Sequence, residues 1–149
     1  MPEYLETTVD KFIFKVATDR YYSKEGLWVQ SDGTHVRIGL SDFLQQRNGD
    51  VAFAEVRPRH TTVRAGEEVA TIETIKVNIS LTSPVSGKVV EVNPAMADTP
   101  EAINQDPYGE GWLAVIEAAD WEADRAALLD PRAYFMLMKG QAEEEAKKS

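Results

Sequence analysis

Glu73-Thr74-Ile75-Lys76-Val77-Asn78-Ile79-Ser80-Leu81 contains the clearest β pattern in the chain, because every second residue from position 75 to position 81 is a large aliphatic one. Such alternation of apolar and polar residues is typical of a half-buried strand. The stretch lies in the middle of a pseudo-repeat, in which segments 63–76 and 77–92 each contain a glycine turn and a Val/Ile-rich strand. The nearest glycines stand ten residues before Lys76 and eleven after it. The midpoint between two similar strand pairs is where a hairpin tip falls, so the pattern predicts Lys76 at a tip.

Outside this stretch the chain contains further short strands separated by turns. Apolar runs or alternation predict strands at 36–40, 51–56, 69–72, 88–92 and 112–116. Ser41 is a suitable N-cap and Gly49 a suitable stop, which together predict a short helix at 41–48. Short strands at this spacing favour a β sandwich or barrel.

The flanks of this β region have a different character. Residues 1–20 form an N-terminal extension with one short apolar run at 12–14, which is read as a weak strand or a docking segment. The β domain is expected at 21–118, with an irregular stretch at 93–111 that is rich in Pro, Asp and Asn. Helices are expected within 119–149, the second opened by Pro131, followed by a polar tail from Gln141 that we expect to be frayed.

Composition excludes several classes of function. The chain has 149 residues with 16 Lys and Arg against 25 Asp and Glu, a formal net charge of −9, which disfavours nucleic acid and anionic membrane surfaces as partners. It contains no cysteine, so thiol chemistry would require a cofactor that brings sulfur. The N-terminus has no signal-peptide pattern and no segment is long and apolar enough for a membrane span, so a cytoplasmic protein is expected.

Lys76 is the candidate functional residue that the pattern indicates. Most lysines are simply solvated surface charges, and a lysine on the wet face of a strand needs no further role. Lys76 differs in standing at the centre of the pseudo-repeat between Ile75 and Val77, which we expect to anchor both sides of the tip. Glu73, three residues earlier, is read either as a recognition mark or as a solvated carboxylate.

Residues 21–118 resemble the H protein of the glycine cleavage system. The resemblance is carried by five segments in the same order and at matching spacing: 22–29, 49–55, 73–77, 83–93 and 104–112. It implies a lipoyl-domain-like fold, the barrel-sandwich hybrid, which is mainly β, with a short inserted helix and C-terminal helices. It also implies a carrier protein and not an enzyme, with no catalytic residue and no metal site of its own.

The cofactor that the resemblance implies is lipoate, joined by an amide to Lys76, with Glu73 as a mark for the lipoylating enzyme. Acylation would convert an ammonium into a neutral arm that reaches on the order of 10–15 Å. Biotin carriers share the fold but typically place Met on each side of the lysine, where this chain has Ile75 and Val77. The implied partners are a lipoate-protein ligase or lipoyltransferase and dihydrolipoamide dehydrogenase.

Several departures from the family pattern bear on the choice of partner enzymes. Gly26 and Leu27 stand where H proteins usually have His-Glu, Val77 where Ala is usual, and the loop at 57–64 is basic. These departures favour the H-protein-like lipoate-binding proteins of the heterodisulfide-reductase-like sulfur-oxidation system, whose complex would then be the partner. The alternatives are a carrier of the aminomethyl group in glycine cleavage, with the glycine cleavage enzymes as partners, and an unmodified interaction module that kept the fold.

Overall fold

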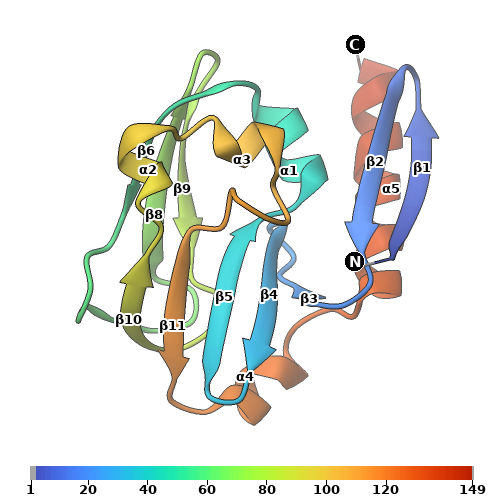
Figure 1. The fold of residues 1–149 in the computed structure, drawn as a ribbon. Helices are drawn as coiled ribbons and strands as arrows, with labels where there is room; N and C mark the ends of the chain where they lie inside the picture. Colours follow the sequence, from blue (N-terminus) through green and yellow to red (C-terminus); the bar gives the residue numbers. More distant parts are fainter. Residues whose placement is uncertain (1–2, 149) are drawn as a thin grey trace.

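The computed structural model describes residues 3–148, and two antiparallel sheets form its body (Figure 1). The larger sheet has six strands, in the spatial order β3 (Tyr21–Tyr22), β4 (Leu27–Asp32), β5 (His35–Leu40), β11 (Ala114–Ala118), β10 (Gly87–Val92) and β7 (Thr62–Val63). The smaller sheet has three strands, in the order β6 (Val51–Val56), β8 (Glu68–Thr74) and β9 (Asn78–Thr82). This arrangement confirms the expected mainly β sandwich architecture.

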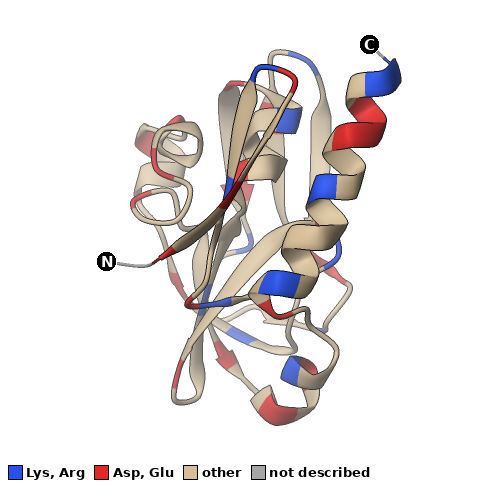
Figure 2. Ribbon diagram, turned by 90° about the vertical axis from the view of Figure 1, so that its right-hand side faces the viewer, with Lys and Arg blue, Asp and Glu red and all other residues tan. Residues whose placement is uncertain are grey.

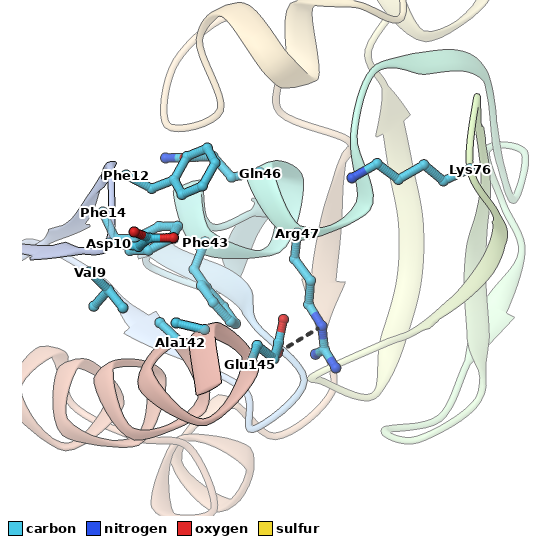
Figure 3. A pocket seen from close by; sticks show the side chains of 11 residues that line it. Val9, Asp10, Phe12, Phe14, Phe43, Gln46, Arg47, Lys76, Ala142 and Glu145 are labelled. Carbon is cyan, nitrogen blue, oxygen red and sulfur yellow. Dashed lines mark ion pairs between the residues drawn. The ribbon is translucent and has the colours of Figure 1, made fainter. Parts of the chain in front are cut away.

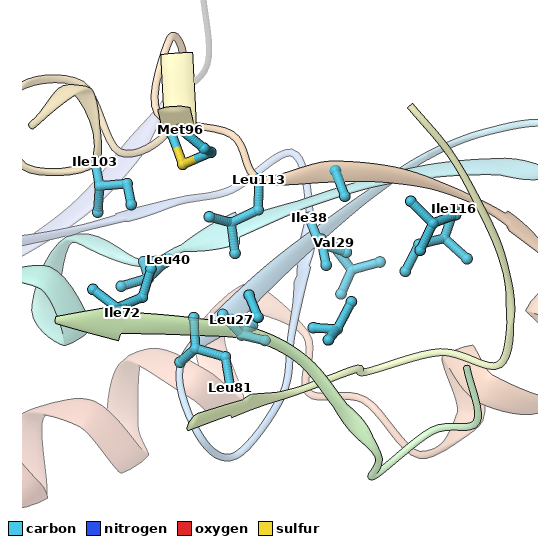
Figure 4. Packing of buried hydrophobic residues seen from close by; sticks show 14 of the residues in the cluster. Leu27, Val29, Ile38, Leu40, Ile72, Leu81, Met96, Ile103, Leu113 and Ile116 are labelled. Atoms are coloured by element: carbon cyan, nitrogen blue, oxygen red, sulfur yellow. The ribbon is translucent and has the colours of Figure 1, made fainter. Parts of the chain in front are cut away.

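The core lies between the two sheets and is filled by aliphatic side chains (Figure 4). Ile38 and Ile116 from the larger sheet and Ile72 from the smaller one are completely buried. Burying one such side chain contributes about 1.5–3 kcal/mol, so this layer accounts for much of the stability of the fold. Gly39 faces Trp28 so closely that a Cβ there would lie 2.5 Å from the indole ring, which explains the glycine in an otherwise apolar strand.

Short helices close one end of the sandwich. Helix α1 (Asp42–Asn48) begins as predicted, with Ser41 Oγ accepting a hydrogen bond from the Leu44 N–H at 3.3 Å, and ends at Gly49. The prediction that residues 93–111 are irregular is wrong in part, because α2 (Ala95–Asp98) and α3 (Ala102–Gln105) form there. Each is a single turn held to the core by one buried side chain, Met96 in α2 and Ile103 in α3, and four residues are too few to show a helical period in the sequence.

The predicted C-terminal helices are present as α4 (Trp121–Ala126) and α5 (Pro131–Lys148). The expectation of a frayed tail from residue 141 is wrong, because α5 continues to Lys148. Its last turns are stabilised by the burial of Ala142 and by an ion pair between Glu145 and Arg47 at 3.2 Å. The C-terminal part of α5 contains both glutamates and lysines (Figure 2). Lys147 lies in the last turn, where a cation interacts favourably with the helix dipole.

The N-terminal extension forms a regular β-hairpin and is more ordered than a leader with a weak strand. Strands β1 (Tyr4–Val9) and β2 (Phe12–Ala17) pair along their whole length and pack beside α5 (Figure 1). The hairpin is tied to α1, since the Lys15 N–H donates to Asp42 Oδ2 at 2.9 Å and Gln46 Nε2 donates to the Ile13 carbonyl at 2.9 Å.

A second apolar cluster joins the hairpin to the rest of the chain. Phe14 of β2 contacts Phe43 of α1 edge-to-face with ring centroids 5.3 Å apart. Tyr134 of α5 stacks on Tyr22 at 4.4 Å, and its hydroxyl shares a 2.8 Å hydrogen bond with Ser41. The cluster therefore links the N-terminal hairpin, α1 and α5 into one unit. In the part of the chain that the structure describes, no helix is both long enough and apolar enough to cross a membrane.

Candidate functional site

Lys76 lies at the tip of the β8–β9 hairpin, where the pseudo-repeat predicted it. Strand β8 ends at Thr74 and β9 begins at Asn78, so three residues form the turn. The Lys76 side chain is exposed, and its position at the end of two paired strands holds it away from the core.

Thr74 organises the backbone of this tip. Its side-chain oxygen accepts hydrogen bonds from the Lys76 N–H at 3.2 Å and the Val77 N–H at 3.0 Å, and its hydroxyl lies 3.1 Å from the Val77 carbonyl, to which it donates. The Thr74 backbone N–H donates to the same carbonyl at 2.8 Å. A threonine at this place in a turn satisfies the backbone groups that the strand ladder leaves free. The sequence pattern alone does not distinguish Thr74, although Ser and Thr are common turn residues.

Gly49 lies directly under the stem of Lys76. A Cβ on Gly49 would stand 3.3 Å from Lys76 Cε and 3.4 Å from its Cδ, and the glycine has φ +87° and ψ −167°, a conformation that other residues rarely adopt. From the sequence, Gly49 is predicted only as a helix stop. Gly49 has a second role, because the absence of a side chain there leaves room for the lysine stem. The sequence does not indicate this role, since residues 49 and 76 meet only in the folded protein.

Asn104 holds this surface in place from α3. Its side-chain nitrogen donates to the Gly49 carbonyl at 3.0 Å, and its side-chain oxygen accepts from the Val51 N–H at 2.9 Å. The Ile75 N–H donates to the Asp50 carbonyl at 3.2 Å, which connects the segment to the lysine tip. Asn104 lies within one of the five segments of family resemblance, but nothing in the sequence indicated this contact.

Ile75 and Val77 do not anchor the tip, which corrects the expectation drawn from the alternating pattern. Ile75 is 75% exposed and Val77 42% exposed, because the strand is interrupted at the turn and neither side chain reaches the core. Glu73 is exposed on β8, where it pairs with Asn78 across the hairpin. Glu73, Ile75, Lys76 and Val77 therefore lie together at one accessible end of the small sheet.

The electrostatic surroundings leave the Lys76 amine accessible. Within residues 3–148, the ion pairs that the structure contains do not involve Lys76. The basic loop at 57–64 follows the far end of β6, because Val51 at the near end of that strand pairs with Thr74. In that loop Arg57 is paired with Glu68 at 3.4 Å. The Lys76 tip and the basic loop at 57–64 thus lie at opposite ends of the small sheet.

This geometry fits a covalently attached acyl group. An exposed primary amine on a braced turn can form one amide bond, and the attached chain needs no enclosing pocket in order to stay bound. Ile75 and Val77, the neighbours of Lys76 in the chain, are exposed, so an enzyme that acylates the amine has access from solvent. A barrel-sandwich fold with a lysine displayed at a hairpin tip defines the class of carrier proteins with a swinging arm.

Comparisons with known proteins specify the family. The family model described as "Glycine cleavage H-protein" matches residues 20–141, and the chain belongs to this family. The "Glycine cleavage system H protein" of Cronobacter sakazakii is 41% identical over 128 residues, covering 85% of this chain and 98% of the relative. A protein of the same description from Thermus thermophilus is 38% identical over 127 residues, with the same coverage.

A similar solved structure belongs to the same family. The "glycine cleavage system H protein (GCVH) from Mycobacterium marinum" superposes with a TM-score of 0.70 at 32% identity, covering 78% of this chain and 94% of that one. Members of this family are carriers and not catalysts, and they hold lipoate covalently on a lysine. The comparisons favour the glycine-cleavage alternative of the sequence analysis and give no support to the sulfur-oxidation interpretation.

Proposed function

We propose that Lys76 carries the lipoyl group and that the protein shuttles reaction intermediates between the enzymes of glycine cleavage. The observation that carries the proposal is an exposed lysine, with no ion-pair partner among residues 3–148, at the tip of a braced hairpin in a chain of the H-protein family. Residues 21–118 are proposed as the carrier domain, with 1–20 as an extension and 119–149 as a C-terminal helical part. The cytoplasm is proposed as the compartment.

Two residues beside Lys76 have a task in this function. Thr74 fixes the direction in which the lysine leaves the hairpin, and Gly49 supports the aliphatic stem without blocking it. Acylation removes the lysine charge, so the arm that leaves the tip is neutral. The lipoyl group, when bound, supplies a disulfide that can be reduced to a dithiol and can carry a transferred group.

Glu73 and Ile75 are proposed as recognition residues for the lipoate-protein ligase or lipoyltransferase. Both are exposed beside Lys76, and neither is needed for the core. Glu73→Gln should slow lipoylation with little change in stability, since surface substitutions outside special sites usually alter the free energy of unfolding by about 0.5 kcal/mol or less. Glu91→Gln, on the larger sheet, is the matched control, and equal lipoylation rates in the two variants would exclude a recognition role for Glu73.

The proposed function is tested by reconstitution with glycine decarboxylase. The lipoylated protein, with its mass verified, is incubated with the decarboxylase, glycine and labelled bicarbonate, and the exchange of label into glycine is measured. Robust exchange that requires Lys76 is expected, with Lys76→Arg as the negative control. A fully lipoylated protein that supports no exchange would refute the glycine-cleavage assignment and return attention to sulfur-oxidation enzymes as partners. Dihydrolipoamide dehydrogenase is the expected partner for reoxidation.

A further inference from the structure

The N-terminal hairpin and Lys76 lie on opposite sides of one cleft of about 310 Å³ (Figure 3). Phe12 of β2 and Lys76 both line this cleft, and α1 contributes Arg47 between them. Figure 3 shows the amine end of Lys76 pointing toward α1, on the side where Phe12 lies. The tips of the β1–β2 and β8–β9 hairpins also lie at the same end of the molecule (Figure 1). The surface around the proposed attachment lysine therefore includes the N-terminal hairpin.

The N-terminal hairpin lies outside the part of the chain that matches the family. The match begins at residue 20, whereas β1 and β2 comprise residues 4–17. The Cronobacter relative is covered over 98% of its length by only 85% of this chain, so this chain has residues beyond the shared part. The hairpin therefore adds to the surroundings of Lys76 a surface that the family model does not include.

A series of contacts fixes the N-terminal hairpin relative to the lysine tip. Strand β2 is hydrogen-bonded to α1 through the backbone of Ile13 and Lys15. Helix α1 ends at Gly49, which lies under the stem of Lys76. A surface whose elements are already held in a fixed relation binds a partner without the entropy cost of ordering them. Phe12 therefore stands at a set place relative to the amine.

Exposed apolar side chains occur on both of these hairpins. Phe12 is 57% exposed, and Ile75 and Val77 on the lysine turn are 75% and 42% exposed. Single exposed apolar residues are common on protein surfaces, but these belong to two elements that meet at one reactive amine. Aromatic residues supply much of the binding energy at protein interfaces. Phe12 is therefore suited to anchor an enzyme that covers this end of the molecule.

We propose that Phe12 on the N-terminal hairpin is a docking residue for the enzyme that acylates Lys76, a lipoate-protein ligase or lipoyltransferase. This inference rests on the proposed function of Lys76. The enzyme joins Lys76 Nζ to the carbonyl carbon of an activated acyl donor, an acyl adenylate or a thioester. The donor's leaving group departs with the bonding electrons, and the amine loses a proton. The reacting atoms must first come within about 3–3.5 Å of each other, so the body of the enzyme lies directly on the surface around Lys76.

The size of a protein interface places Phe12 under that enzyme. A typical interface covers about 800 Å² on each partner, which is a patch of about 16 Å in radius if it is circular. Phe12 lines the same 310 Å³ cleft as Lys76, so a patch centred on the amine includes it. Enzymes that act on the attached cofactor meet the far end of an arm that is on the order of 10–15 Å long. Their bodies need not reach the hairpin, so the acylating enzyme is the partner that the position of Phe12 favours.

The test measures the kinetics with which the acylating enzyme of the native host lipoylates the full-length protein, with the carrier as the varied substrate. Phe12→Ser should raise KM about tenfold, because truncating an aromatic anchor weakens binding by about that factor. The kcat should stay the same, because a docking contact stabilises the bound substrate and the transition state equally. Phe12→Leu should recover most of the loss. Ile13→Ser is the matched control and should leave KM unchanged, since Ile13 is 54% exposed but points to the opposite face of the same strand.

A KM that rises in Phe12→Ser alone, with normal bicarbonate exchange once that variant is fully lipoylated, supports the docking role. Equal KM values in the wild type, Phe12→Ser and Ile13→Ser, or the same increase in both variants, overturn it and leave the carrier function standing. A fall in kcat at constant KM also overturns it, because Phe12 would then act through the geometry of the amine. Exchange that falls while lipoylation is normal overturns it by assigning Phe12 to the decarboxylase. A wild-type chain that is not lipoylated overturns the proposed function and this inference with it.

Discussion

Replacing Thr74 with valine should loosen the lysine tip without unfolding the protein. The substitution keeps the β-branched shape but removes the oxygen that makes three hydrogen bonds, to the Lys76 N–H, the Val77 N–H and the Val77 carbonyl. A hydrogen bond contributes about 0.5–1.5 kcal/mol net, and water replaces part of that at an exposed turn, so we expect a total local loss of about 1.4 kcal/mol. That loss corresponds to an approximately tenfold shift in the local opening equilibrium.

Amide hydrogen exchange measures this effect directly. The amides of Lys76 and Val77 should exchange about tenfold faster in Thr74→Val, while amides in β4 and β5 keep their protection. Thr71→Val, earlier on the same strand, is the matched control and should leave the tip amides unchanged. Lipoylation should also slow, because the lysine samples more directions. Unchanged exchange at both tip amides would refute the reasoning that Thr74 braces the turn.

Three further perturbations follow from the same geometry. Gly49→Ala should cost about 1–3 kcal/mol in the free energy of unfolding, because φ +87° with ψ −167° strains any other residue. A denaturation midpoint equal to that of the wild type would contradict this. Asn104→Ala should cost about 1–3 kcal/mol, because the Val51 N–H and the Gly49 carbonyl lose their partner. Slower lipoylation of the folded Asn104→Ala variant would show that losing these hydrogen bonds also disturbs the Lys76 tip. An unaltered rate would show that Asn104 contributes to stability alone. Burial raises the pKa of Tyr134 to about 12 from the usual 10, so the contribution of this tyrosine to the free energy of unfolding is complete below about pH 10 and is lost as the pH rises toward 12. Burial also raises the pKa of Tyr22 and of Tyr108, so these two add to the slope over the same range. The loss amounts to about 3 kcal/mol. Tyr134→Phe should make this part of the pH–stability curve less steep, and an equally steep curve in that variant would assign the whole slope to other groups.

The regular parts of the fold could be predicted because their sequence patterns are local. The alternation in β5 and β9, the N-cap at Ser41 and the stop at Gly49 each follow from a few neighbouring residues, and the structure has them where they were expected. The hairpin tip at Lys76 followed from the symmetry of its two flanking glycine turns. The prediction that Ile75 and Val77 anchor the tip was wrong. The alternation continues through the turn, and the pattern cannot show that these two residues lie outside the sheet.

The parts that were missed depend on contacts distant in sequence. The C-terminal part of α5 is a helix because Ala142 packs near the N-terminal hairpin, and its polar composition alone favours fraying. The support of Lys76 by Gly49 and Asn104 joins residues from three separate segments. The preference for sulfur oxidation came from a few departures from the family pattern, namely Gly26, Leu27, Val77 and the basic loop. Similarity over most of the chain favours glycine cleavage instead.

The central claim is that one amine, that of Lys76, receives the lipoyl group. The most direct test is the intact mass of the protein isolated from lipoate-replete cells, followed by peptide mapping. The account predicts the bare chain plus one lipoyl group on Lys76, the bare mass for Lys76→Arg, and the full adduct for Lys88→Arg, a control at an exposed lysine on β10. An unmodified wild-type protein, or an adduct that persists in Lys76→Arg, would contradict it.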